Sequence, residues 1–272
     1  MNLTGIVDRI LYFFYQCNTY EEKLLRYQGY RPNSVKVWKN QLGFSWGMTR
    51  KVLEKLEILD APRIRSIFTE VVYQHQAVFS HEHCFITSFG EEGKSGNKVI
   101  YEFRHANLVK GGRIVKSWEL PRLPEKSIIV FVDDLIGTGT QSVDFISKRL
   151  NLMLNPSHEA ILLTLCATPE GIEHVQENTN FKVITGMVLE KSKYQHYEKE
   201  CGYFSEHERD YIIKANARLK KQTSINHDKG LLLAFYYSVP NNTMPIVWKE
   251  KYEYENERGE KKQWFALLPR QF

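Results

Sequence analysis

The spacing of hydrophobic and polar positions divides the chain into segments of different character. From about residue 4 to residue 79, apolar side chains recur three and four positions apart, as in Val35 and Trp38. This spacing is typical of amphipathic helices that bury one face. We therefore predict a helical layer packed on a core, with breaks at 30–32 and 43–47, where proline or glycine occurs.

The centre of the chain shows two alternating kinds of apolar pattern. Short continuous runs at 84–90, 128–132, 160–167 and 183–189 are typical of buried strands. Helical spacing fills the stretches between them, and the last of these helices opens with Pro169, a residue favoured in a first turn. Strands and helices that alternate through short loops imply right-handed crossovers and a parallel sheet.

Other segments do not follow this alternation of strands and helices. Residues 108–118 alternate around Gly111 and Gly112, which is typical of a β-hairpin. After residue 190, a charged stretch with helical character is followed by strand-like runs at 231–238 and 244–248. We interpret this last part as an addition to the central core.

The predicted fold class is therefore α/β: a parallel-sheet core with a helical N-terminal extension and an α+β C-terminal addition. We place the extension at residues 1–80, the core at 81–190 and the addition at 191–272. A chain of 272 residues is long enough to bury a core of this kind.

Composition and charge indicate a soluble protein. With 42% hydrophobic and 25% charged residues, the chain is ordinary for a globular protein, and its apolar run Ile10–Tyr15 is too short to span a membrane. The net charge of +5 is mild and comes without a long basic block, so it is no nucleic-acid signature, and direct nucleic-acid binding stays open. The four cysteines are widely separated, which indicates reduced thiols and predicts a cytoplasmic location.

A cluster of histidines offers a weak metal motif. His75, His81, His83 and Cys84 lie near a predicted helix-to-strand junction. No second pair of ligands has the spacing that a zinc site needs, so the junction itself explains these residues better.

The strongest chemical signal follows the run 128–132. The adjacent carboxylates of Asp133 and Asp134 stand at the end of a buried strand, where they lose hydration and repel each other unless hydroxyls, a cation or a ligand face them. A Gly/Thr loop, Gly137–Gln141, leads into a helix, so its backbone N–H groups form an anion site. Hydroxyl acceptors beside a phosphate cradle predict a phosphorylated sugar as the ligand.

Two common phosphate-binding motifs fit this segment poorly. A P-loop needs a lysine at the start of the helix, where this chain has Thr140. The loop nearly spells a dinucleotide fingerprint, but there the glycines follow the strand directly. In this chain the acidic pair intervenes, and it would face the pyrophosphate of a dinucleotide.

The segment instead resembles the 5-phosphoribosyl-1-pyrophosphate (PRPP) motif of type I phosphoribosyltransferases, and the strand–helix order extends the resemblance through Leu189. In that family the loop binds the ribose 5-phosphate and the acidic pair binds the ribose hydroxyls. The resemblance implies catalytic roles for Asp133 and Asp134, with Mg²⁺ held through PRPP. It implies phosphate binding by Gly137, Thr138, Gly139, Thr140 and Gln141.

Two loop positions depart from the family pattern. The family often has Ala or Asp in place of Gly137, and members with Asp use it near the incoming base, so this chain lacks that role. Gln141 stands where Thr or Ser is usual; it is bulkier, although its amide can still donate to a phosphate.

A second loop lies in the place of the family's pyrophosphate loop. Gly93, Lys94, Ser95 and Gly96 follow one predicted strand and precede a helix. Amides at a helix N-terminus and one ammonium group suit a pyrophosphate leaving group. The predicted hairpin at Gly111 corresponds to the flexible loop that closes over PRPP in the family, and a plain surface hairpin is the alternative.

Short matches near both ends narrow the resemblance to phosphoribosyltransferase-like proteins of bacterial conflict systems, some encoded beside retron reverse transcriptases. The matches include Trp38, Arg104, the stretch Pro240–Trp248 and Leu268–Arg270. They imply substrate contacts for Arg104 and Asn242, and a toxic anti-phage effector held silent by partners such as a regulator or a reverse transcriptase with its DNA or RNA. A β-turn alone also explains the proline and asparagines of this stretch.

Three functions remain open at this point. The first is an enzyme acting at ribose C1, whose acceptor is a nucleobase, a nucleotide or a macromolecule, or water in the case of a hydrolase. The second is a non-catalytic module that senses PRPP or a nucleotide, which the absence of a carboxylate at Gly137 permits. The third is a scaffold with a vestigial sugar site, because a fold does not determine a function.

Overall fold

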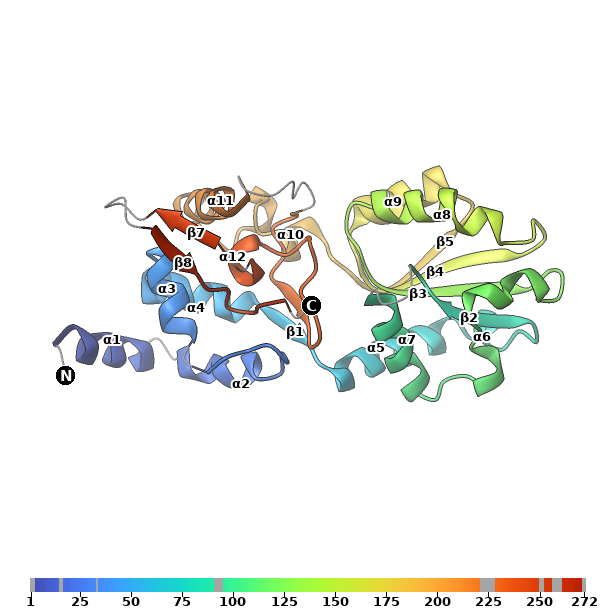
Figure 1. The fold of residues 1–272 in the computed structure, drawn as a ribbon, viewed down its shortest axis with the longest axis horizontal. Helices are drawn as coiled ribbons and strands as arrows, with labels where there is room; N and C mark the ends of the chain where they lie inside the picture. The colour runs from blue at the N-terminus through green and yellow to red at the C-terminus, as the bar shows by residue number, and fades with distance from the viewer. Residues whose placement is uncertain are drawn as a thin grey trace. The chain divides into compact units, whose positions relative to one another are not determined.

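Two stretches that are far apart in the sequence fold together. Residues 1–60 and 191–272 form one unit, which we call the terminal unit, and residues 61–190 form the sheet unit (Figure 1). The computed structural model describes residues 3–14, 17–32, 34–90, 95–220, 228–249, 252–255 and 261–270. The predicted extension and addition are thus parts of one unit, and the first boundary lies at residue 60 instead of 80 because the helix at 61–74 contacts the sheet.

The sheet unit is a parallel four-stranded sheet covered by helices on both faces. Its strands are β2 (Cys84–Ser88), β3 (Ile128–Ile136), β4 (Glu159–Ala167) and β5 (Lys182–Val188), in the order β2-β3-β4-β5. Its α-helices are α5 (Ala61–Gln74), α6 (Gln76–Phe79), α7 (Ser95–His105), α8 (Thr140–Lys148) and α9 (Pro169–Asn178), and its short 3-10 helices are η2 (Gly111–Arg113), η3 (Ser117–Arg122) and η4 (Leu150–Leu152). α8 and α9 lie on one face, and α5 and α7 on the other (Figure 1). The predicted α/β fold with a parallel core is confirmed.

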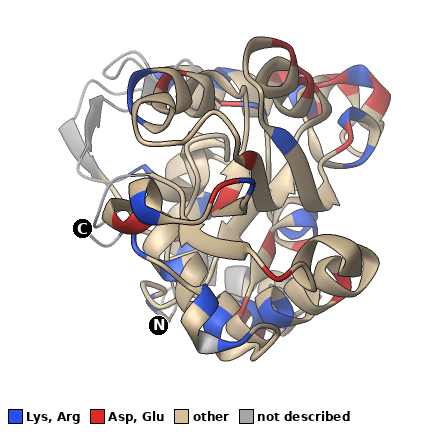
Figure 2. Cartoon of the chain, turned by 90° about the vertical axis from the view of Figure 1, so that its right-hand side faces the viewer, with Lys and Arg blue, Asp and Glu red and all other residues tan. Residues whose placement is uncertain are grey.

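The sheet forms here because its central strands are apolar on both sides. The side chains of residues 129–132 in β3 and 161–163 in β4 are almost completely buried, as expected for parallel strands with helices on both faces. Both basic and acidic residues occur along helices of the chain (Figure 2). At the end of β4, Thr168 caps α9 by accepting a hydrogen bond from Gly171 N (3.1 Å), and Pro169 occupies the first turn as predicted.

Three predicted elements differ in the structure. Within residues 108–118, Gly111–Arg113 form a 3-10 helix instead of the turn of a hairpin. Ile114 pairs with Ile86, and Val115 N donates to Ile86 O (2.9 Å), so the backbone of this segment bonds to β2. Residues 245–248, predicted as strand, form a short helix that opens with a proline. Residues 57–59, predicted as helix, form a strand because they pair with residues 233–235, a long-range partner that helical spacing does not reveal.

The terminal unit is mainly helical. Its α-helices are α1 (Leu3–Phe14), α2 (Glu21–Leu24), α3 (Ser34–Leu42), α4 (Trp46–Lys55), α10 (Lys191–Tyr194), α11 (Glu206–Lys220) and α12 (Pro245–Trp248), with 3-10 helices η1 (Cys17–Tyr20) and η5 (Lys199–Cys201). Its strands are β1 (Glu57–Leu59), parallel to β6 (Leu233–Phe235), and β7 (Tyr252–Glu255), antiparallel to β8 (Lys261–Trp264). Among the helices of the described ranges, none combines the length and apolar character that crossing a membrane requires.

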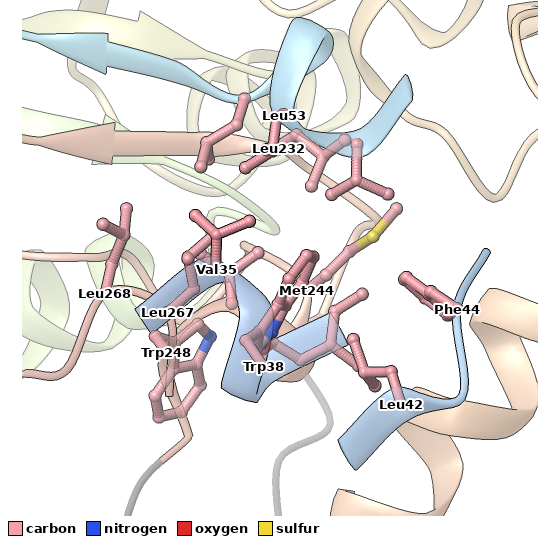
Figure 3. Close-up of a cluster of buried hydrophobic side chains, with 14 of the residues drawn as sticks. Val35, Trp38, Leu42, Phe44, Leu53, Leu232, Met244, Trp248, Leu267 and Leu268 are labelled. Atoms are coloured by element: carbon pink, nitrogen blue, oxygen red, sulfur yellow. Dashed lines mark hydrogen bonds between the residues drawn. The ribbon is translucent and has the colours of Figure 1, made fainter. Parts of the chain in front are cut away.

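The core of the terminal unit joins its N-terminal and C-terminal segments. Val35 and Trp38 of α3 lie against Met244, Leu267 and Leu268 in one buried cluster (Figure 3). The indole of Trp38 is fully buried, and its Nε1 donates to Ile246 O (2.6 Å). This single side chain therefore contributes both apolar contact and a buried hydrogen bond between the two segments.

The motifs near the C-terminus belong to the same core. Trp248 Nε1 donates to Thr243 O (2.9 Å), and Thr243 N donates to Pro240 O (3.1 Å), which closes a turn. Above the Trp248 ring, the guanidinium of Arg270 lies 3.5 Å from the ring centroid. These contacts explain the conspicuous residues of Pro240–Trp248 and Leu268–Arg270 by packing and turn formation.

Trp38→Ala is expected to lower the free energy of unfolding by about 3–5 kcal/mol, because it leaves a cavity and removes the bond to Ile246. Urea unfolding followed by far-UV circular dichroism measures this without relying on tryptophan emission. The neighbouring Val37, which is 47% exposed, provides the control: Val37→Ala should change the free energy by less than about 0.5 kcal/mol. Equal effects of the two substitutions would contradict the assignment of Trp38 to the core.

Candidate functional site

The acidic pair lies in the last part of β3, at the carboxyl edge of the sheet. Asp133 pairs with Thr164 of β4. It lies two residues after Phe131 in the same strand, so it shares the face on which Phe131 packs with residues of α8 and α9. Successive residues of a strand point to opposite faces, and Asp134 correspondingly approaches the start of α7, where the Ser95 side chain hydrogen-bonds to it. The backbone N–H of Asp134 also donates to Asp133 Oδ1 (2.9 Å).

Both carboxyl groups titrate at a higher pH than exposed ones. Burial raises the pKa of Asp133 well above its ordinary value, and the neighbouring Asp134 raises it further. Burial also raises the pKa of Asp134, to about 6, although the hydrogen bond with Ser95 opposes this effect. Both residues keep some exposed surface, so a ligand can reach them. Hydroxyl donors or a cation placed there would favour the ionised form of the pair.

The loop after β3 forms an open cradle of amides. The first hydrogen bond of α8 runs from Val143 N to Gly139 O (2.9 Å), so the N–H groups of Thr140, Gln141 and Ser142 precede the helical ladder and are available to an anion. Thr138 Oγ1 donates to Thr140 Oγ1 (3.2 Å), which places two hydroxyls at the same end of the helix. Thr140 and Gln141 are exposed.

Gly139 is required in this cradle for two reasons. Its φ of +76° lies in the left-handed region, which favours glycine. A Cβ at this position would also lie 2.8 Å from Gly171 O and 3.2 Å from the His174 side chain. The loop therefore turns tightly against α9.

The second predicted loop reaches the same edge of the sheet. Ser95 and Gly96 begin α7, and a Cβ on Gly96 would lie only 2.1 Å from Phe89 O, so the helix start packs directly on the end of β2. Phe89 N in turn donates to Val132 O of β3 (2.9 Å). The structure thus brings Ser95 and Gly96 together with the acidic pair, whereas Gly93 and Lys94 lie outside the described residues.

The donor set suits Mg²⁺ held jointly with a phosphorylated ligand. Among the described residues, no three His, Cys, Asp or Glu side chains lie together as an all-protein metal site would need. Mg²⁺ characteristically binds through one or two carboxylates, several waters and substrate phosphates. Asp133 and Asp134, beside an amide cradle, match that requirement.

The two other predicted substrate contacts are Arg104 and Asn242. Arg104 is exposed in the last turn of α7, about 13 Å along the helix axis from Ser95, so the structure does not bring it to the acidic pair. Asn242 belongs to the terminal unit, where its backbone carbonyl accepts hydrogen bonds from Lys229 N (3.0 Å) and Leu231 N (3.3 Å). These bonds give Asn242 a structural part in the turn that precedes Trp248.

Two residues that contact the cradle were not predicted. Thr168 Oγ1 donates to Gly137 O (2.5 Å), and Gly171 packs directly on the same carbonyl. The sequence around Pro169 predicted a helix start, but it did not reveal that this helix would meet the loop after β3. The signal that could have indicated it is the parallel topology, which places the ends of β3 and β4 at one edge.

Comparison with known proteins gives one family match. The family model described as PRTase-CE matches residues 35–270. Curated protein sequences yield no match. The family match, together with the parallel sheet, agrees with the predicted type I phosphoribosyltransferase-like fold.

Several solved structures are also similar. Orotate phosphoribosyltransferase from Aeropyrum pernix is 16% identical, with 46% of this chain and 69% of that chain covered and a TM-score of 0.33. Orotate phosphoribosyltransferase from Mycobacterium tuberculosis in complex with inorganic phosphate is 11% identical, with coverages of 47% and 71% and a TM-score of 0.31. Adenine phosphoribosyltransferase from Leishmania donovani is 10% identical, with coverages of 54% and 68% and a TM-score of 0.33.

Asp134→Asn is expected to stabilise the protein at neutral pH. Because the folded pKa of about 6 exceeds the ordinary value of 3.8, the unfolded state ionises first, and the wild-type free energy of unfolding falls as pH rises from about 4 to about 6. The variant lacks this charge, so its advantage should grow across that window to the order of 2 kcal/mol. Urea unfolding at pH 4 to 8 measures the difference.

Asp144→Asn is the matched control for this experiment. Asp144 lies on α8, 59% exposed, and pairs with Lys148 at 3.1 Å, a surface ion pair of little energetic weight. Its substitution should leave the pH profile of the wild type unchanged. The same profile for both variants would show that Asp134 is not held in a desolvated site.

Proposed function

The chain belongs to the PRTase-CE family, and we propose that it is a phosphoribosyltransferase-like enzyme that acts at C1 of the ribose in PRPP. One observation supports this most: the acidic pair, the amide cradle of α8 and the start of α7 meet at one edge of the sheet. That edge combines acceptors for sugar hydroxyls with two helix N-termini suited to phosphates. Ligands of open α/β sheets bind at the carboxyl ends of the strands.

Different residues bind different groups of PRPP in this proposal. The 5-phosphate lies in the cradle, held by the amides and hydroxyls of Thr138, Gly139, Thr140 and Gln141. Asp133 and Asp134 accept hydrogen bonds from the ribose hydroxyls, and the pyrophosphate lies toward Ser95 and Gly96. Holding all three groups at once places C1 in a defined position before reaction, which removes much of the entropic barrier.

Reaction at C1 exchanges one bond for another. The bond from C1 to the pyrophosphate oxygen breaks, and its electron pair leaves with the pyrophosphate. A lone pair of the acceptor forms the new bond to C1, and the acceptor's proton passes to solvent. Positive charge develops on C1 and the ring oxygen during this exchange, and the carboxylates of Asp133 and Asp134 stabilise it electrostatically.

Mg²⁺, when bound with PRPP, supplies charge neutralisation for the departing pyrophosphate. The acidic pair is the part of this chain that would hold it, through one or both carboxylates. The raised pKa values fit this role, because a cation beside the pair lowers the cost of ionising both groups. The acceptor is a nucleobase, a nucleotide or a macromolecule, or water if the enzyme is a hydrolase.

The biological role that we propose is that of a toxic effector in a bacterial anti-phage defence system, acting in the cytoplasm. The support is the resemblance of the sequence to proteins of conflict systems, some of them associated with retrons. In such a system, partners of the same operon, such as a regulator or a reverse transcriptase with its DNA or RNA, would hold the effector silent until infection.

A non-catalytic sensor is the second candidate, and one observation favours it. Gly137 carries no carboxylate near the expected acceptor position, and its carbonyl is bound by Thr168. The chain would then bind PRPP or a nucleotide and transmit that state to a partner. Binding without turnover distinguishes this function from the enzyme.

PRPP and Mg²⁺, incubated with the protein and candidate acceptors, should yield free pyrophosphate faster than PRPP alone decomposes. The Asp133→Asn/Asp134→Asn double variant should lose this activity by a factor on the order of 10² or more, because the charge at C1 is no longer stabilised. Asp144→Asn is the matched control and should keep wild-type turnover. Turnover in the double variant at the wild-type level would refute the assigned site, and calorimetric binding of PRPP without pyrophosphate release would favour the sensor.

Expression of the wild type in bacteria without its partners should arrest growth if the protein is an effector. The double variant at the same protein level should permit growth while it still copurifies with its operon partners. Growth curves and immunoblots of both strains test this. Growth arrest by the double variant would show that toxicity does not depend on Asp133 and Asp134.

A further inference from the structure

A buried threonine joins the loop after β3 to the start of α9 through hydrogen bonds. Thr168 has no exposed surface. Its Oγ1 donates to Gly137 O (2.5 Å) and accepts from Gly171 N (3.1 Å), while its backbone N–H donates to Ile136 O (3.0 Å). One residue therefore holds the end of β3, the first peptide of the loop and the start of α9.

Two glycines let the loop and the helix touch backbone to backbone. A Cβ on Gly171 would lie 2.3 Å from Gly137 O and 2.8 Å from Ile136 Cγ2. In the opposite direction, a Cβ on Gly139 would lie 2.8 Å from Gly171 O. Neither position has room for a side chain, so this backbone contact requires glycine at both positions.

The bond to Gly137 O also sets the direction of a neighbouring amide. In a planar trans peptide, the C=O and the following N–H point in opposite directions. With the Gly137 carbonyl turned inward to Thr168, the N–H of Thr138 points away from α9. A carbonyl facing the cradle would repel a phosphate, whereas an N–H at that place attracts it.

We propose that Thr168 is a positioning residue for the phosphate cradle, acting through the Gly137–Thr138 peptide with Gly171 as its packing partner. This inference rests on the proposed binding of the PRPP 5-phosphate at the start of α8. Thr168 touches no substrate in this arrangement. It fixes the orientation of an amide that would otherwise have to be ordered when the ligand binds, and such preorganisation raises affinity.

Thr168→Val and Thr168→Ser separate the hydroxyl from the shape of the side chain. Valine keeps the volume and the branch but removes both hydrogen bonds of Oγ1, whereas serine keeps the hydroxyl. We expect Thr168→Val to weaken calorimetric PRPP–Mg²⁺ binding by about tenfold, the effect of losing one or two buried hydrogen bonds. With a catalytic assay, KM should rise more than kcat falls. Thr168→Ser should stay within about threefold of the wild type.

Hydrogen–deuterium exchange of the ligand-free proteins tests the same inference independently of PRPP. In Thr168→Val, the hydrogen-bonded amides of Val143 (acceptor Gly139 O) and of residue 168 (acceptor Ile136 O) should exchange faster, while those of residues 129–132 stay protected; Thr168→Ser should match the wild type at both places. Unchanged exchange at both Val143 and residue 168 in Thr168→Val overturns the inference, as does faster exchange with unaltered PRPP affinity. If the wild type binds no PRPP, the proposed function fails, and the exchange experiment still decides whether Thr168 orders the loop.

Discussion

The parallel register of β3 with its two neighbours is the constraint on which the candidate site depends. Ser88 pairs with Val132 on one side, and Ala167 pairs with Ile136 on the other. β4 ends level with β3, whereas β2 stops opposite Val132, just before the acidic pair. Because the three strands run in the same direction, the segments that follow them meet at one edge. The starts of α7, α8 and α9 thereby converge around residues that are far apart in the sequence.

This convergence makes a desolvated acidic pair tolerable. Two adjacent carboxyl groups in a buried strand end are unfavourable, and burial raises the pKa of both. The hydrogen bond between Ser95 and Asp134 offsets part of that cost, and a ligand rich in hydroxyls with an associated cation would offset more. Titratable groups whose pKa values are shifted by burial are common in functional sites. The cost of burying them is offset when a ligand or cation binds beside them.

The terminal unit shows how conspicuous sequence motifs can serve the fold. The stretch Pro240–Trp248 forms a turn and a short helix, held by the bonds of Trp248 to Thr243 and of Trp38 to Ile246. Tyr27 OH donates to Pro269 O (2.7 Å), which ties a third segment into the same core. A packing role therefore accounts for the tryptophans and for Tyr27, and the turn that the sequence offered as an alternative is present at Pro240–Thr243. A substrate contact by Asn242 stays a prediction.

The sequence by itself determined the elements whose signal is local. The strand at 128–132, the helix that opens at Pro169 and the change from loop to helix within Gly137–Gln141 depend on neighbouring residues, and the structure has all three. The tertiary structure decided what depends on distant partners. Residues 57–59 became a strand because residues 233–235 pair with them, and residues 108–118 lost their hairpin to the edge of β2. Thr168 reached Gly137 only because two parallel strands end together, a geometry that hydrogen bonds between strands impose and that no local pattern encodes.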